Sequence, residues 1–222
     1  MLADKIIHKE FKPLKPSDAA SLALAKMDAW QVTSMPVVEP TTERVIGQIR
    51  LDELIDLKDE SIPISSLELQ VPPVVYQHQH VFEVARLMFL HEIRLIPVVS
   101  IEEQFLGIIE KKTVLETLSG MLNISASGSV ITVELGKQDL TVSELVRLIE
   151  NEDATILGFT VQSPENEDES YSVSFKLSVN DTSVISSTLQ RYGYTVMSDA
   201  DSRVLQHDIS SRADELMRYL DV

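Results

Sequence analysis

The clearest absence from this sequence of 222 residues is cysteine, which does not occur at all. Without cysteine there is no disulfide framework, no zinc-finger site and no thiolate nucleophile. Histidine is also scarce, with five residues. His78 and His80 lie close together, but no third ligand is near them in the sequence. We therefore interpret them as solvated turn residues and expect no metal site.

Long apolar runs are missing as well. No window approaches the roughly 18 consecutive apolar residues that a membrane helix needs. The opening stretch MLADKIIHKEF mixes charged with apolar residues and has no continuous apolar region of the kind found in signal peptides. These patterns predict a cytoplasmic protein without membrane insertion.

Basic residues are too few to favour binding to nucleic acid. Lys and Arg number 19 against 35 Asp and Glu, which gives a formal net charge of −16. Affinity for a phosphate backbone depends on Lys and Arg, so we expect no nucleic-acid partner. The sequence also has no Gly-Xaa-Ser-Xaa-Gly, Walker or His-Glu-Xaa-Xaa-His motif, and we predict no enzyme and no catalytic residues.

What the chain does contain is an internal repeat. Met35-Pro36-Val37-Val38 recurs 61 residues later as Ile96-Pro97-Val98-Val99, and Gly47 recurs as Gly107. The preceding segments share a helical spacing of apolar residues, with Ala20, Ala23, Leu24 and Met27 recurring as Val81, Val84, Ala85 and Met88. Such a spacing predicts one apolar helix face in each copy.

Each copy therefore reads as strand, helix, strand, strand, helix. We expect short first strands near residues 12–14 and 74–76, and final helices over residues 51–57 and 112–121. Ser17 or Asp18 is a favourable N-cap for the first long helix. Since one copy alone exposes an apolar sheet face, the two copies are expected to pack about a pseudo-two-fold axis.

This pattern resembles a tandem pair of cystathionine-β-synthase (CBS) domains. The matching stretches are SMPVVEPTTERVIGQIRLDEL and LIPVVSIEEQFLGIIEKKTVL, each preceded by its amphipathic helix. The resemblance covers residues 1–122, with the first unit at 1–58 and the second at 62–122. It implies a cleft between the units that binds an adenosine nucleotide, with AMP, ADP, ATP and S-adenosylmethionine as the candidate ligands.

The resemblance also indicates which residues would bind the nucleotide. In the family a Ser or Thr after the Gly-containing strand binds phosphate, and an Asp three residues later binds ribose. Here Arg50 and Glu53 occupy those positions in the first copy. Glu110 and Thr113 occupy them in the second, where an anion at Glu110 would repel phosphate. Arg94, before the second Pro-Val-Val strand, is a further candidate.

A second domain follows the polar linker at residues 123–129. Alternating apolar residues predict strands in SVITVEL, ILGFTVQ, YSVSFKLSV and YTVM, and helical spacing predicts helices in TVSELVRLIEN and TSVISSTLQRYG. Thr141 with Glu144 forms a capping-box pattern. The order β-α-β-β-α-β is that of a ferredoxin-like fold. The fold class is therefore α/β of the α+β kind, and residues 199–222 form an extension with a short amphipathic helix.

This second domain, over residues 130–198 and directly after a CBS pair, is similar to an ACT domain. The combination is similar to CBS–ACT regulatory proteins of the acetoin-utilisation type. The resemblance implies an amino-acid-like ligand where the sheets of two chains meet. It places Gly136 and Asp139 in the ligand-contacting loop, and a simple connecting loop is the alternative.

Two main functions remain open at this point, and a subunit of a larger enzyme or transporter complex is a third, minor possibility. The first is a non-catalytic regulatory sensor, which binds an adenosine nucleotide in the CBS cleft, an amino-acid-like metabolite at the ACT interface, or both. The second is a ligand-free dimeric scaffold whose CBS cleft has degenerated. In both we expect a homodimer, with a small-molecule effector or a protein target as partner.

Overall fold

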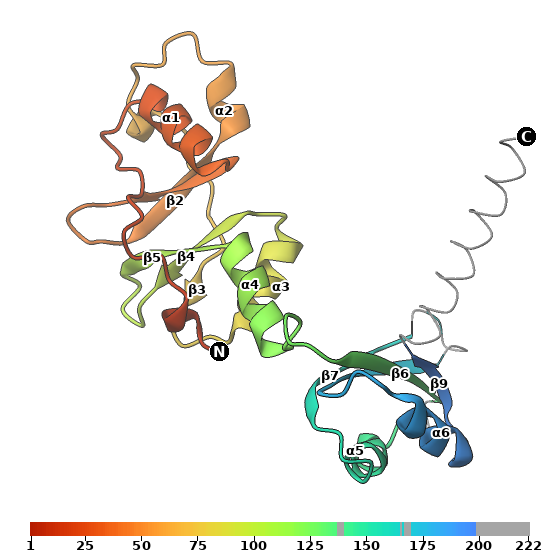
Figure 1. Ribbon diagram of the computed structural model, residues 1–222. Helices are drawn as coiled ribbons and strands as arrows, with labels where there is room; N and C mark the ends of the chain where they lie inside the picture. Colours follow the sequence, from red (N-terminus) through yellow and green to blue (C-terminus); the bar gives the residue numbers. More distant parts are fainter. Residues whose placement is uncertain (137–139, 165, 167–169, 199–222) are drawn as a thin grey trace, which may run out of the picture. The chain divides into compact units, whose positions relative to one another are not determined.

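The computed structural model describes residues 1–136, 140–164, 166 and 170–198 (Figure 1). The chain divides into two compact units, Met1–Leu118 and Ser119–Val222. The described secondary structure is mixed α/β, as predicted. The predicted C-terminal helix lies outside the described residues.

The first unit contains both copies of the repeat. The first copy comprises α1 (Ala20–Trp30), β1 (Ser34–Val38), β2 (Val45–Arg50) and α2 (Leu51–Ile55). The second comprises β3 (Val75–Tyr76), α3 (Val81–Leu90), β4 (Leu95–Val99), β5 (Phe105–Glu110) and α4 (Lys111–Met121). Where the sequence predicts a first strand at 12–14, the structure has an isolated parallel bridge between Leu14 and Val37. It corresponds to the parallel pairing of Val75 with Val98 in the second copy.

A short 3₁₀ turn precedes each copy and packs on the other one. We call residues 1–8 and 62–70 the leading segments. Residues 1–8 contain the turn Ala3–Lys5, and residues 62–70 contain Ile64–Ser66. Ala3 is buried with the core of the second copy, and Ile64 with the core of the first. Each copy is therefore completed by the segment that leads into the other.

Hydrogen bonds of the leading segments repeat at the same offset as the sequence. Ala20 N donates to Ile62 O at 3.0 Å, and Val81 N donates to Met1 O at 2.9 Å. Isolated bridges join Ala19 to Pro63 and Leu2 to His80 in the same way. The two copies are thus related by an approximate two-fold rotation.

The axis of this rotation passes close to Arg44 and Gln104. These residues occupy equivalent positions in the two copies, and they form an antiparallel bridge with each other. A two-fold rotation moves each residue onto its equivalent in the other copy. Two equivalent residues can therefore be in contact only if both lie close to the axis. Phe105 N also donates to Glu43 O at 2.7 Å across this line. The predicted pseudo-two-fold packing is confirmed.

The repeated glycine is explained by the leading segments. A Cβ atom on Gly47 would lie 2.6 Å from Leu69 Cβ, and one on Gly107 would lie 2.6 Å from His8 O. Gly107 also has a φ of +146°, which side chains rarely adopt. Both glycines therefore let the opposite leading segment approach the sheet.

The caps expected from the sequence are not formed. Helix α1 begins after Ala19 without a side-chain cap, and Asp18 Oδ2 accepts from Lys15 N at 3.0 Å instead. The first two amides of α1, on Ala20 and Ser21, donate to backbone carbonyls of Ile62 and Glu60. Tertiary contacts thus supply the acceptors that a capping side chain would offer. In α3 the second amide binds Nδ1 of His80 at 3.3 Å.

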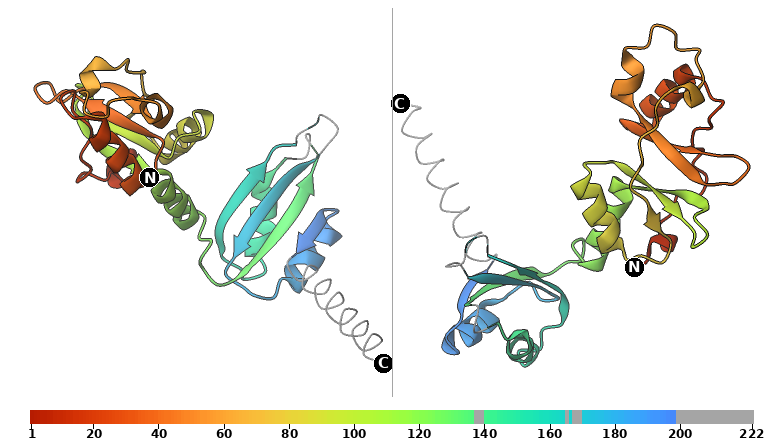
Figure 2. Two further views of the ribbon diagram at one scale, coloured as in Figure 1. Left: turned by 90° about the horizontal axis from the view of Figure 1, so that it is seen from above. Right: turned by 180° about the vertical axis from the view of Figure 1, so that it is seen from behind.

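The second unit is an antiparallel sheet covered by helices on one face (Figure 2). Its elements are β6 (Ser129–Leu135), α5 (Val142–Glu150), β7 (Ile156–Gln162), β8 (Tyr171–Leu177), α6 (Ser183–Arg191) and β9 (Thr195–Ser198). The strand order β7-β8-β6-β9 is that of the predicted ferredoxin-like fold. The core lies between the sheet and the two helices and is centred on Phe175.

One local prediction in this unit is wrong, and one strand is less regular than expected. Thr141 makes no capping bond, because Glu144 Oε2 accepts from Tyr194 Oη at 3.0 Å instead of turning back to the helix start. The strand predicted for ILGFTVQ is confirmed as β7, but its register shifts between Ile156 and Gly158, which interrupts the alternation at Leu157.

Candidate functional site: a polar cleft in the repeat pair

A polar cleft of about 410 Å³ opens beside the end of β2 in the first unit. Both copies contribute to it. The first copy supplies the ends of β1 and β2, and the second copy supplies the turn after α3. The lining residues are Thr33, Ser34, Gln48, Arg50, Gln70, Val71, Pro73, His91, Glu92 and Ile93.

Arg50 is the strongest cationic group of the cleft. It is the last residue of β2 and the N-cap of α2, and its side chain is 52% exposed. Its Nε donates to Asp52 Oδ1 at 3.1 Å. A guanidinium carries five N–H donors in a planar fork, so one bond to Asp52 leaves donors that suit a phosphate.

Glu53 does not line the cleft, but it holds two of the lining residues, Arg50 and Gln70, in place. Its Oε2 accepts from the backbone N of Arg50 at 2.7 Å, and its Oε1 accepts from Gln70 Nε2 at 2.6 Å. The carboxylate thereby ties the start of α2 to a leading segment. Each oxygen retains a second lone pair, which is what a ribose hydroxyl would need.

The other two nucleotide candidates are separate from this cleft. Arg94 lines a neighbouring depression of about 380 Å³, which shares Thr33 with the cleft, and its Nη1 donates to Gln31 O at 3.1 Å. Thr113 stands on the first turn of α4, where its carbonyl accepts from Thr117 Oγ1 at 2.7 Å. It is not among the residues that line the cleft.

The equivalent region of the second copy is built differently. His91 and Gln70 of the cleft correspond to Trp30 and His8. The Trp30 ring packs edge-on against His8 at 5.3 Å and against Phe11 at 4.9 Å between ring centroids. Large rings therefore occupy the place where the first copy has a cleft.

Several residues of the cleft were not predicted as site residues. Gln70 belongs to a leading segment, and nothing in the local sequence indicates that this segment returns to β2. His91 stands at the C-terminal end of α3, and no local motif marks it as a site residue.

The second unit has its own polar depression beside Gly136. It measures about 510 Å³ and is lined by residues such as Glu134, Thr141, Glu144 and Tyr192. Gly136, one of the two residues predicted for the ACT ligand loop, lines this depression. Asp139, the other residue of that prediction, lies outside the described residues.

The described part of the chain contains no group of three or more His, Asp or Glu side chains arranged to hold a metal ion. Within the same residues, no helix is long and apolar enough to cross a membrane.

Comparison with known proteins identifies one part of the chain directly. Residues 65–120 match the family model of the CBS domain. The first copy has the same arrangement of strands and helices about the pseudo-two-fold axis, so the prediction of a CBS-domain pair is confirmed. A comparison with curated proteins gives no match.

Solved structures resemble parts of this chain at low identity. A protein from Methanocaldococcus jannaschii is 19% identical, with a TM-score of 0.50 and 70% of each chain covered. A CBS domain pair/ACT domain protein from Thermotoga maritima is 21% identical, with a TM-score of 0.49, covering 54% of this chain and 98% of that one. CBSX2, a CBS-pair protein of Arabidopsis thaliana solved in complex with AMP, is 21% identical, with a TM-score of 0.46 and coverages of 54% and 96%. At such identities the likeness concerns the fold alone.

Proposed function

We propose that this CBS-domain pair is the sensor of a non-catalytic regulatory protein and that it binds an adenosine nucleotide in the cleft beside Arg50. The observation that carries the proposal is the cleft itself, where a guanidinium, two hydroxyl groups and two amides surround a space of about 410 Å³. This volume lies within the range of small-molecule sites, about 300–1,000 Å³.

The lining offers a separate partner for each part of a nucleotide. Arg50 suits the phosphate, and the side-chain amide of Gln70, which is held by Glu53 outside the lining, suits the ribose hydroxyls. Val71, Pro73 and Ile93 provide apolar surface for the adenine ring. Binding would act on the protein only if one arrangement of its parts binds the nucleotide better than another.

Calorimetry with AMP, ADP, ATP and S-adenosylmethionine tests this proposal. We expect a Kd below about 1 mM for at least one of them. Arg50→Gln should weaken binding of the phosphate-bearing ligands about tenfold, because it removes a charge-assisted hydrogen bond. Since S-adenosylmethionine carries no phosphate, its affinity should change less.

Arg86→Gln is the matched control for this experiment. Arg86 lies on the surface of α3, where it pairs with Glu83, and it does not line the cleft. It should leave all four affinities unchanged. If none of the ligands binds below the millimolar range, or if Arg50→Gln binds as well as the parent, the proposed site is wrong.

The ACT assignment of the second unit is also part of the proposal. A ligand with an ammonium group would meet the carboxylates of Glu134 and Glu144 in the depression beside Gly136. A thermal-shift screen of the full chain with the common amino acids tests it, since a ligand of the native state raises the melting temperature. Glu144→Gln should reduce the shift for any amino acid that binds.

A dimeric scaffold is the second candidate, and one observation favours it. The helices of the second copy expose large apolar side chains, with Phe82 at 60%, Phe89 at 82% and Leu115 at 68%. Such side chains gather at interfaces more often than on free surfaces. We therefore propose a homodimer that buries this helix surface, whether the protein acts as a nucleotide sensor or as a scaffold.

Sedimentation velocity over a range of concentrations tests the dimer. Phe89→Glu should shift the equilibrium to the monomer, because it introduces a charge into the apolar surface. Ile101→Glu is the control, since Ile101 is 72% exposed but lies in the turn between β4 and β5. A monomeric parent chain, or an equal effect of both variants, would contradict this interface.

A further inference from the structure

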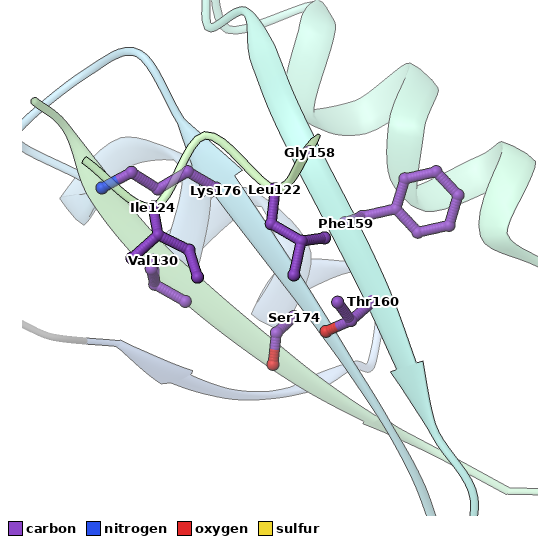
Figure 3. Close-up of a pocket in the computed structure, with 8 residues that line it drawn as sticks. All are labelled: Leu122, Ile124, Val130, Gly158, Phe159, Thr160, Ser174 and Lys176. Atoms are coloured by element: carbon purple, nitrogen blue, oxygen red, sulfur yellow. The ribbon is translucent and has the colours of Figure 1, made fainter. Parts of the chain in front are cut away.

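A second cavity, unrelated to the cleft beside Arg50, lies on the sheet face of the second unit that the helices leave uncovered. Its volume is about 220 Å³. Side chains from β6, β7 and β8 form its floor, and the segment after α4 forms its roof (Figure 3). The lining residues are Leu122, Ile124, Val130, Gly158, Phe159, Thr160, Ser174 and Lys176.

The roof is held in place by a specific bond. Asn123 has a φ of +51°, and its Nδ2 donates to Leu157 O at 2.7 Å. Leu157 has no partner in the ladder with β8, because the register of β7 shifts between Ile156 and Gly158. The irregular strand therefore offers a carbonyl to Asn123, and Leu122 and Ile124 on either side of Asn123 extend over the sheet.

Gly158 allows this close approach. A Cβ atom at this position would lie 3.3 Å from Leu122 O and 3.6 Å from Leu122 Cα. Any side chain there would also enter the cavity, since Gly158 is part of its floor. The glycine thus maintains both the roof and the empty space below it.

The walls are mainly apolar, and one end is cationic. Leu122 and Ile124 of the roof lie over the floor, to which Val130 belongs, and the stem of Lys176 runs beside Ile124 (Figure 3). The hydroxyl of Ser174 is already hydrogen-bonded to Thr132 Oγ1 at 2.8 Å. An apolar ligand can therefore cover this part of the floor without breaking a hydrogen bond to water that Ser174 would need.

Lys176 is the one charged residue among those that line the cavity. Its Nζ donates to Gly128 O at 3.3 Å, which uses one of the three donors of an ammonium group. The remaining donors can bind an anion at the rim. An apolar slot that ends at an ammonium group is complementary to a molecule with a hydrocarbon tail and a negative head.

We propose that this cavity binds a short-chain aliphatic carboxylate, with the carboxylate on Lys176 and the tail between Leu122, Ile124 and Val130. The size supports a short chain, because 220 Å³ is below the range of about 300–1,000 Å³ for drug-sized ligands. A tail of about four to six carbons fills a space of this order, which equals roughly seven water volumes.

Titration of the full chain with hexanoate, followed by amide NMR and by calorimetry, tests this proposal. We expect a Kd below about 1 mM and shifts centred on residues 122–124, 158–160 and 174–176. Hexylamine, which has the same tail and the opposite charge, should bind at least tenfold more weakly, and 1-hexanol should also bind more weakly.

Two variants separate the charge from the space. Lys176→Met retains the apolar stem and should weaken hexanoate binding about tenfold while leaving 1-hexanol unchanged. Lys112→Met, on the surface of α4, is the matched control and should have no effect. Val130→Phe should fill the cavity and abolish binding of both hexanoate and 1-hexanol. The melting temperature of this variant without ligand shows whether it is folded.

Binding of hexanoate, hexylamine and 1-hexanol with equal affinity would overturn the proposal, as would shifts at other residues or no binding up to about 10 mM. The result does not depend on the nucleotide cleft, because Arg50→Gln leaves this cavity intact. Failure here and failure of the proposed sensor function are therefore distinguishable.

Discussion

The two copies of the repeat share a backbone, but they present different chemistry at equivalent positions. The cleft of the first copy has Ser34, Gln48 and Arg50 where the second has Leu95, Ile108 and Glu110. The leading segments, the bridges and the glycines are nevertheless conserved between the copies. The difference shows that the backbone symmetry serves folding, while the side chains of one cleft were free to become apolar or acidic.

The largest effect is expected from substituting the repeated glycines. Gly107→Ala should lower the free energy of unfolding by about 3 kcal/mol, because the new Cβ meets a backbone oxygen at a strained φ. Gly47→Ala should cost less, about 2 kcal/mol, because its Cβ would meet Leu69 Cβ at 2.6 Å but its φ is not in the positive range. Urea unfolding followed by fluorescence of the single Trp measures both. If the two variants lost the same free energy of unfolding, the proposed difference in strain between Gly47 and Gly107 would be contradicted.

Exchanging the aromatic residues between the copies should have a smaller effect. Trp30→His should lower the free energy of unfolding by about 2 kcal/mol, because it removes ring contacts with His8 and Phe11. The reciprocal change, His91→Trp, should cost little stability but narrow the cleft and weaken AMP binding about tenfold. Calorimetry and urea unfolding of both variants test this pair. Unchanged AMP binding in His91→Trp would argue against the proposed cleft.

The helix starts provide a third comparison. His80→Ala should cost about 0.5–1 kcal/mol, because the second amide of α3 loses its acceptor. Ala19→Ser should add less than about 0.5 kcal/mol, since carbonyls of Ile62 and Glu60 already satisfy the first amides of α1. Thermal unfolding measures both changes. If Ala19→Ser instead stabilised the protein by about 1 kcal/mol, as a new N-cap normally does, the carbonyls of Ile62 and Glu60 would be poor acceptors for the amides of α1.

The smallest effect concerns an ion pair that α3 has and α1 lacks. Bidentate hydrogen bonding from Arg86 holds the pKa of Glu83 below its ordinary value of 4.5. A lowered carboxyl pKa stabilises the fold above the unfolded pKa, and this contribution disappears as the pH falls through the folded pKa. In Arg86→Gln the pKa of Glu83 should return towards its ordinary value, as measured by NMR titration. Lys112→Gln should leave the pKa of Glu83 unchanged.

The periodic features of the fold were accessible from the sequence. The Pro-Val-Val strands, the helix spacing and the 61-residue offset predicted the CBS pair, and alternation predicted the ferredoxin-like unit. The strands and helices could be predicted because their apolar spacing involves residues close together in the sequence, and the offset could be read because the same motif occurs twice. The helix caps were predicted wrongly because their acceptors come from segments some 40 residues away, such as Ile62 for Ala20.

The candidate sites were only partly accessible. Arg50 and Gly136 stay predictions that depend on the family resemblance, and the structure shows that each lines a depression. Gln70 and His91 were not, because they reach the cleft through tertiary packing. The hexanoate cavity had no sequence signal either, since it depends on the register shift in β7 and on the bond from Asn123 to Leu157.

Because each copy is completed by the leading segment of the other, a fragment that contains only one copy should behave differently from the full chain. A fragment with one repeat alone would keep its own leading segment but lose the one that completes its core, leaving a vacant groove beside Gly47 or Gly107. Two copies of that fragment could each fill the groove of the other. Such halves are therefore expected to assemble as domain-swapped pairs, in which a true two-fold axis replaces the approximate one.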